Sequence, residues 1–343
     1  MSARKTSAAD SIAIDPFHER GAAPVHTRMR LLGCDFEFES ESPGLQRIVT
    51  AAYANLPRHK LSATVPRCKV RLMRAPRGRQ TRRGGIPPLE MLSGADFLSA
   101  TTHTSDWVVL SPVQRAGLIV VSQEMLRSAY HVRYELLEFG VFTLASRVQG
   151  LVPLHAACIG RGGRGLLLMG DSGAGKTTAA LLGLLRGLDF LSEDSVFVAP
   201  DSLLATGVAN FLHTRRDALR FVPAASAAMI RRSPIIRRRS GVEKFEVDLR
   251  RTGFRLAPRP LQIVASVFLT AQPAGDRSLV APIRGTDLRA RLRSTQPYAA
   301  NQAGWPRFSR RIASLPAFEV RRGEHPTATV DALETILVQT GRH

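Results

Sequence analysis

The sequence predicts an α/β protein in two parts, a small α+β region followed by a larger α/β core. Three observations predict it. Residues 165–187 read as a continuous apolar strand, a glycine-rich loop and a strong helix former. Residues 261–270 form a second continuous apolar run, typical of a buried strand. Upstream of residue 150, short alternating segments precede one long amphipathic segment, residues 123–148.

The first part begins with a polar segment, residues 1–27, which we expect to be a poorly ordered tail. Residues 29–40 alternate like one half-buried strand, and Ser42-Pro43 predicts the start of a helix that reaches Asn55. Residues 68–73 alternate again, and the apolar runs 107–110 and 118–122 predict paired strands. The helix predicted over 123–148 leads into the core, so the N-terminal α+β region covers residues 28–150.

The core, residues 151–343, is predicted to open with one strand over 152–160. After the glycine-rich loop and its helix, two short strands, 189–191 and 195–199, flank an acidic pair. Residues 229–241 are rich in arginine and broken by Pro and Gly, so we expect an exposed, mobile insertion. Helices over 287–292 and 328–338 and a strand over 317–321 complete the core.

Composition narrows the class of protein. The chain has 343 residues, of which 44% are hydrophobic and 22% charged, as in ordinary globular proteins. No apolar run approaches the roughly 18–20 residues that span a bilayer, so we expect no membrane association. The three cysteines, Cys34, Cys68 and Cys158, match neither a disulfide framework nor a zinc pattern. With no signal peptide expected, these features predict a cytoplasmic protein.

The formal net charge of +20 raises the question of a polyanionic partner. Only five of the 48 basic residues are lysine, and few aromatic residues are interleaved with the arginines to stack on bases. The sequence therefore disfavours nucleic acid, and an acidic peptide is at least as compatible a partner. The basic segments 74–85 and 229–241 are where a polyanion would bind, although such segments are more often solvated surface.

The strongest motif is the loop formed by Gly170, Asp171, Ser172, Gly173, Ala174, Gly175, Lys176 and Thr177. It matches G-x-x-x-x-G-K-[ST] and lies between a predicted strand and a predicted helix, as this motif requires. The glycines let backbone N–H groups approach phosphate oxygens, and the helix N-terminus adds partial positive charge. Lys176 would contact the β- and γ-phosphates and Thr177 would bind Mg²⁺. The loop predicts a nucleotide site for ATP with Mg²⁺.

A phosphate loop alone does not define a reaction. Glu193 and Asp194 follow the next predicted strand, where one carboxylate could hold Mg²⁺ and the other accept a proton from an attacking hydroxyl. An acidic dipeptide between two strands is also typical of a solvated turn. His155 lies in an apolar strand upstream, where a histidine is more often a satisfied core residue. Taken singly, these residues leave both interpretations open.

Taken together, the residues resemble the kinase core of the HPr kinase/phosphorylase family, bacterial enzymes that phosphorylate a serine of the carrier protein HPr. The family's loop reads G-D-S-G-x-G-K-[ST], and this chain has GDSGAGKT. His155 stands 21 residues before Lys176 and Asp194 stands 18 after it, which are the family's spacings for its catalytic histidine and aspartate. The resemblance covers residues 154–196.

The resemblance implies a P-loop core with a mixed sheet, similar to that of phosphoenolpyruvate carboxykinase. It implies catalytic roles for Lys176, for Asp194 as general base and for His155 as an orienting group. Glu193 would support either Mg²⁺, together with Thr177, or the acceptor. The family's downstream magnesium-binding glutamate has no clear counterpart, and Asp217 is a weak stand-in. The N-terminal region is more similar to stand-alone HPr-kinase-like proteins. Some of those belong to lasso-peptide clusters, where such kinases modify a serine of a precursor peptide.

The sequence therefore predicts an ATP- and Mg²⁺-dependent kinase acting on a serine of a peptide or protein. Two alternatives stay open. One keeps the fold but takes a small acceptor such as free serine, and the other is a nucleotide-gated regulatory protein that binds a polyanion. A homo-oligomer is compatible with all three.

Overall fold

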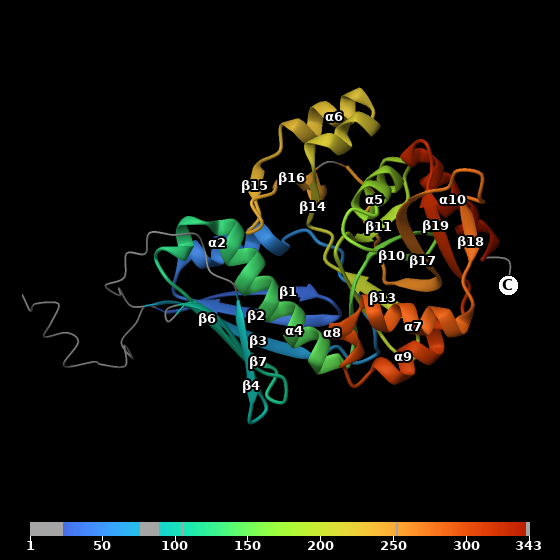
Figure 1. Cartoon of the computed structure of the whole chain (residues 1–343). Helices are drawn as coiled ribbons and strands as arrows, with labels where there is room; N and C mark the ends of the chain where they lie inside the picture. The colour runs from blue at the N-terminus through green and yellow to red at the C-terminus, as the bar shows by residue number, and fades with distance from the viewer. Residues whose placement is uncertain (1–22, 76–88, 104–105, 252, 341–343) are drawn as a thin grey trace, which may run out of the picture.

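The computed structural model describes residues 23–75, 89–103, 106–251 and 253–340. The first seven strands share one sheet, and we call the residues up to 150 the N-terminal unit and those from 151 onward the core. The two units lie side by side, the N-terminal one running from blue to green and the core from green to red (Figure 1). The core has a mixed sheet, as predicted, and the sheet of the N-terminal unit is mixed as well. Most of the basic segment 74–85 lies outside the described residues. Within those ranges, no helix has the length and apolarity needed to cross a membrane.

The N-terminal unit is a seven-stranded sheet with helices on one face. Its strand order is β1-β2-β3-β7-β6-β5-β4, in which β2, β3 and β7 are parallel and the other neighbours antiparallel. The strands are β1 (Val25–Leu31), β2 (Cys34–Ser40), β3 (Arg67–Arg74), β4 (Glu90–Gly94), β5 (Phe97–His103), β6 (Asp106–Ser111) and β7 (Ala116–Val121). The predicted pairing of the 107–110 and 118–122 segments is confirmed.

Two expectations for this unit are wrong. The single strand predicted over 29–40 is a hairpin, because Leu32 and Gly33 have φ of 51° and 82° and turn the chain between β1 and β2. The strand β1 also begins at Val25, so residues 25–27 do not belong to a tail, while residues 1–22 lie outside the described residues. The β4–β5 hairpin was not predicted, because every residue of β4 is exposed and the strand lacks an apolar alternation.

The helices of this unit follow the sequence signals. α2 (Pro43–Tyr53) begins after Ser42, whose side chain accepts a hydrogen bond from the Leu45 N–H at 3.4 Å. The helix predicted over 123–148 is present as a succession of short turns and one long helix. These are η1 (Met125–Arg127), α3 (Ala129–His131), the π-helical segment η2 (Val132–Leu137) and α4 (Glu138–Gln149). α2 and α4 pack their apolar faces on β2, β6 and β7.

The core is built on a mixed sheet. Its strand order is β11-β9-β10-β17-β13-β12-β8, with β19 added beside β17 and β18 beside β19. β10, β17 and β19 are parallel and the other pairs antiparallel. The strands are β8 (Val152–His155), β9 (Ala157–Arg161), β10 (Arg164–Met169), β11 (Asp189–Ser192), β12 (Ser195–Val198), β13 (Leu204–Gly207), β17 (Leu261–Pro273), β18 (Val280–Pro282) and β19 (Ala317–Arg322).

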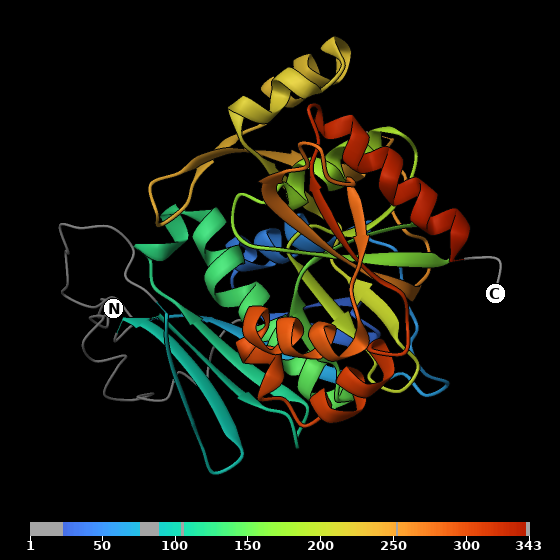
Figure 2. The same ribbon diagram turned by 45° about the vertical axis from the view of Figure 1, so that its right-hand side comes forward.

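Helices cover both faces of this sheet, so the core has three layers (Figure 2). α5 (Lys176–Leu185) and α10 (Pro326–Gln339) pack on one face with Leu166 and Leu168 of β10. α7 (Gly285–Thr295), α8 (Pro297–Ala300) and α9 (Trp305–Ile312) pack on the other with Leu167 and Met169. Burial of successive β10 residues on opposite faces explains why this strand reads as a continuous apolar run.

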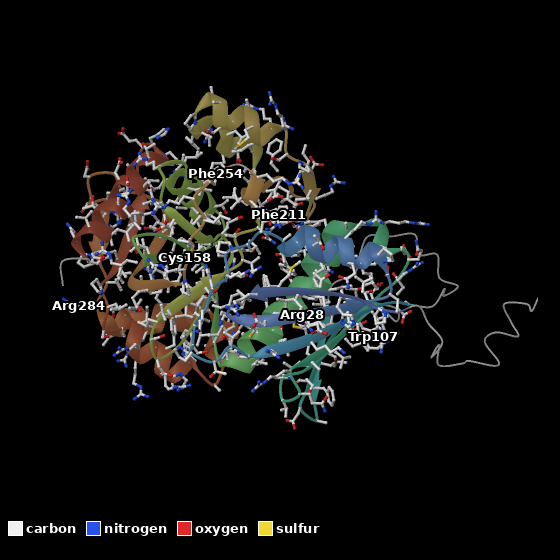
Figure 3. The ribbon with its side chains drawn as sticks, turned by 180° about the vertical axis from the view of Figure 1, so that it is seen from behind. Arg28, Trp107, Cys158, Phe211, Phe254 and Arg284 are labelled. Carbon is white, nitrogen blue, oxygen red and sulfur yellow. The ribbon has the colours of Figure 1, made fainter. Side chains whose placement is uncertain are left out.

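A small sheet, β14-β16-β15, stands above the core. Its elements are β14 (Phe211–Thr214), η3 (Arg216–Phe221), α6 (Ala224–Arg231), β15 (Ile235–Arg237), β16 (Glu243–Asp248) and η4 (Leu249–Arg251). The insertion expected over 229–241 is mostly exposed, as predicted, but it includes the end of α6 and the strand β15. Ile230 and Ile236 are buried between the arginines, and Ile230 belongs to the hydrophobic cluster beneath α5 and α10. Seen from behind, Phe211 lies where β14 passes the N-terminal unit (Figure 3).

Candidate active site

The glycine-rich loop joins β10 to α5, which is the strand–loop–helix arrangement predicted for residues 165–187. Gly170, Gly173 and Gly175 have φ of 139°, 86° and 98°, a region that other residues rarely adopt. Gly175 is the N-cap of α5, so the loop residues lie at the positive end of that helix. The arrangement is suited to an anionic ligand.

Lys176 lies over this loop. Its ammonium donates hydrogen bonds to the carbonyl oxygens of Gly170 at 2.6 Å and Asp171 at 3.3 Å. Burial lowers the pKa of Lys176, and the negative charges of Asp194, Asp171 and Glu193 oppose that shift. The cation therefore faces both the loop and the acidic pair.

Glu193 is buried, with 7% of its surface exposed, and both of its oxygens are engaged. Oε1 accepts a hydrogen bond from the Thr177 hydroxyl at 2.8 Å, and Oε2 accepts one from the His213 backbone N–H at 2.8 Å. A solvated turn would leave this carboxylate in water. Through its hydrogen bond with Thr177, Glu193 instead connects the end of β11 to the first turn of α5.

The donor set of Thr177 and Glu193 fits Mg²⁺. A hydroxyl and a carboxylate oxygen are ligands that Mg²⁺ prefers, and Mg²⁺ is usually bound by one or two carboxylates together with substrate phosphates. Over the described ranges, no group of three or more His, Cys, Asp and Glu side chains is placed to hold a metal by itself. The two predicted metal ligands lie together.

His155 and Asp194 form an ion pair, with 3.0 Å between Nδ1 and Oδ1. The strand predicted over 152–160 is divided at Ala156 into β8 and β9, which join different parts of the sheet. β8 pairs with β12 so that His155 lies opposite Ser195, which brings its ring to the neighbouring Asp194. The His155 side chain is 61% exposed, so it is not a core residue.

The Asp194 carboxylate is held in its ionised form. Burial raises its pKa, but the hydrogen bond with His155 and the charges of His155, Arg238 and Lys244 outweigh this effect and bring the pKa to about 2. His155 and Asp194 also line one side of a cavity of about 470 Å³. A substrate group in this cavity would meet a carboxylate that can accept a hydrogen bond.

Two cations from the small sheet complete the site, and the sequence analysis did not single them out. Burial lowers the pKa of Arg238, but the neighbouring Tyr134 and Asp194 outweigh it and raise the pKa. Lys244 faces the same carboxylates, and burial lowers its pKa. The Nε of Arg238 is buried and has no hydrogen-bond partner. A buried, unpartnered guanidinium nitrogen close to the Asp194 and Glu193 carboxylates is suited to receive an anionic oxygen.

Other side chains position the pair and the carboxylate. The buried Gln296 side chain accepts from the His155 N–H at 2.8 Å and donates to the His155 carbonyl at 3.0 Å. The buried Glu246 accepts from Arg133 and lies 3.1 Å from the ring of His213, whose backbone holds Glu193. No local pattern marks these residues, which come from distant segments. Asp217, the weak candidate for a second magnesium ligand, is exposed and pairs with Arg215.

Comparisons with known proteins add little to this geometry. No protein-family model matches the chain, and no curated protein matches it. Among solved structures, the chain is similar to the Hpr(Ser) kinase/phosphatase from Coxiella burnetii, at 13% identity and a TM-score of 0.30. That match covers 55% of this chain and 90% of the other. A similarity at this level leaves the function to be argued from the site itself.

Proposed function

We propose that this protein is a Mg²⁺- and ATP-dependent kinase of the HPr-kinase type, which transfers the γ-phosphate to a serine hydroxyl of a peptide or protein. One observation carries the proposal. The glycine-rich loop with Lys176, the Thr177–Glu193 pair and the His155–Asp194 pair meet at one place, although they come from separate strands and loops. Phosphate binding, magnesium binding and acceptor binding are the three parts that phosphoryl transfer needs.

The loop side would bind the phosphates. Backbone N–H groups of residues 170–177 and the N-terminus of α5 favour anions, and Lys176 would contact the β- and γ-phosphates. Arg238 and Lys244 add positive charge beside the acidic pair. Thr177 and Glu193 would hold Mg²⁺, which neutralises charge on the phosphates when it is bound.

The acceptor side would orient the hydroxyl. Asp194 accepts its hydrogen bond, and His155 holds the carboxylate in place through the 3.0 Å contact. The acceptor oxygen forms a bond to the γ-phosphorus as the bond from that phosphorus to the β,γ-bridging oxygen breaks, which releases ADP, and Asp194 takes the hydroxyl proton. A carboxylate with a pKa of about 2 is a weak base at neutral pH, so orientation of the hydroxyl is its larger contribution.

The experiment that tests this proposal is transfer of label from γ-labelled ATP to serine-containing peptides, free serine and HPr. Asp194→Asn should leave nucleotide affinity near that of the wild type and lower transfer by about 10²–10⁴-fold, because it removes the carboxylate that orients the acceptor hydroxyl and takes its proton. Equal losses of binding and transfer in this variant would refute the role of Asp194.

Lys176→Ala serves as the complementary variant. Because Lys176 would contact the phosphates in the ground state as well as during transfer, we expect this variant to bind nucleotide more weakly and to transfer less. Normal phosphotransfer by Lys176→Ala would show that the loop does not bind the nucleotide.

A further inference from the structure

The cavity beside the His155–Asp194 pair is shared by the two units. Its lining residues come from α4 of the N-terminal unit and from β8, β12 and α8 of the core, together with Met91 of β4. Its larger apolar lining residues are Met91, Phe139, Phe142, Leu154, Phe197 and Tyr298. The rings of Phe142 and Phe197, one from each unit, pack edge to face with their centroids 5.2 Å apart. This part of the lining therefore depends on how the units are joined.

The chemistry of the cavity contrasts with that of the rest of the site. Among the described residues that line it, the ionisable acid and base are Asp194 and His155, and the lining includes neither lysine nor arginine. In a chain with a net charge of +20, this is an unusual surface. Lys176, Arg238 and Lys244 also act on the Asp194 carboxylate, but none of them lines the cavity, which is mainly apolar.

The nucleoside is a poor occupant for this cavity. None of residues 170–177, all of which the structure describes, is among its lining residues. In phosphoryl transfer the attacking and leaving oxygens lie roughly in line across the γ-phosphorus. The nucleoside follows the leaving oxygen, so a cavity in contact with Asp194 lies on the side from which the acceptor approaches.

We propose that this cavity binds a bulky apolar side chain next to the acceptor serine, so that the preferred substrate is a peptide in which an aromatic or large aliphatic residue flanks the phosphorylated serine. This inference rests on the proposed kinase function and adds the substrate class. A volume of about 470 Å³ exceeds what a serine side chain fills. Met91 and Tyr298 are 64% and 53% exposed, so the cavity is open to solvent where a continuing peptide chain can leave.

The test uses peptides of equal length with one serine, flanked on either side by Phe, Leu, Ala or Asp, and γ-labelled ATP. The wild-type protein should phosphorylate the Phe and Leu peptides with a kcat/KM about tenfold or more above that of the Ala peptide, and should disfavour Asp. Thr143→Trp, which fills the cavity from α4, and Tyr298→Ala, which removes part of its wall, should both reduce this preference. Phe97→Ala removes an exposed ring that does not line the cavity, so this variant should keep the preference for Phe and Leu peptides.

Equal kcat/KM for all four flanking residues would overturn the inference while leaving the kinase function intact. A rise in the KM for ATP, with the KM for peptide unchanged, in Thr143→Trp and Tyr298→Ala would also overturn it, because the cavity would then hold the nucleoside.

A binding measurement separates the two proposals. Fluorescence anisotropy of labelled peptides in which alanine replaces the serine, with a non-hydrolysable ATP analogue present, reports cavity binding without transfer. Tighter binding of the Phe peptide that is lost in Thr143→Trp supports the binding of an apolar peptide side chain in the cavity even if no acceptor is phosphorylated, and absence of phosphorylation would then count against the kinase function alone. Equal binding of the Phe and Asp peptides refutes the inference.

Discussion

At the scale of single residues, Gly170 shows how closely the loop is tied to the sheet. A Cβ at this position would lie 2.3 Å from the backbone oxygen of Leu269 in β17, and the residue has a φ of 139°. Gly173, three residues on, also has positive φ, but a Cβ there would meet no atom within 4 Å. A substitution at Gly173 would therefore cause backbone strain alone, whereas one at Gly170 would cause the same strain and a steric clash.

We expect Gly170→Ala to lower the free energy of unfolding by more than Gly173→Ala does. Both variants incur backbone strain of about 1–3 kcal/mol, and Gly170→Ala must in addition move β10 away from β17. Chemical denaturation followed by circular dichroism measures the difference, and nucleotide titration measures the accompanying loss of affinity. Equal unfolding free energies for the two variants would contradict the close approach of Gly170 to β17.

At the scale of elements, the β15–β16 hairpin changes the interpretation of the Arg-rich segment. The pattern of arginines broken by Pro and Gly predicts an exposed loop, yet β15 pairs with β16 and directs Arg238 toward Asp194. The adjacent Arg237 is 74% exposed and pairs with Glu243 at 3.9 Å. Two neighbouring arginines therefore have different surroundings, which makes them a matched pair for mutation.

Arg238→Gln should weaken nucleotide binding by roughly 10- to 100-fold, since a charge-assisted hydrogen bond contributes about 1.5–3 kcal/mol. Arg237→Gln should change it little, because this side chain lies in solvent. Titration with a fluorescent ATP analogue gives both affinities under the same conditions. Should the two variants bind equally well, the hairpin does not take part in phosphate binding.

At the scale of the whole molecule, buried polar contacts join the two units. His59, after α2, accepts from the Thr206 hydroxyl at 2.8 Å and donates to the Ala257 carbonyl at 2.9 Å. Arg250 donates to carbonyls at the C-terminus of α2, including those of Ala51 and Ala54. Cations at a helix C-terminus are favourable because the last carbonyls lack partners there.

His59 should make stability depend on pH. Burial is the main cause of its lowered pKa, so the folded protein holds the ring neutral while the unfolded chain binds a proton below about pH 6.5. The stabilisation is therefore present above that pH and is lost as the pH falls below it. For the wild type, we expect this residue to contribute a slope of up to about 1.4 kcal/mol per pH unit, which His59→Gln removes.

Denaturation of both proteins between pH 5 and pH 8 measures this contribution as the difference between their slopes. The free energies at pH 8 give the cost of the altered hydrogen bonds alone, because the ring is neutral there in both folded and unfolded states. Parallel slopes for the two proteins would show that His59 is not held neutral.

The sequence by itself determined the parts that depend on neighbours along the chain. Strand β10, the loop, helix α5, the cap of α2 and the strands on either side of the acidic pair follow from local periodicity and from residues with special backbone preferences. The spacing of His155, Lys176 and Asp194 also matched that of the HPr kinase/phosphorylase family, and the structure brings the three residues together because one strand–loop–helix unit and its flanking strands connect them.

Only the tertiary structure decided what these residues meet. Gln296 holds the backbone of His155 across 141 positions of sequence, and Arg133 reaches Glu246 across 113. The division of the 152–160 segment into β8 and β9, the turn of Arg238 toward Asp194 and the cavity between α4 and α8 likewise depend on distant partners. A local sequence pattern predicts which face of a helix or strand is apolar. It does not predict the hydrogen-bond partner of a polar group, because that partner comes from a distant segment that only the folded chain brings near.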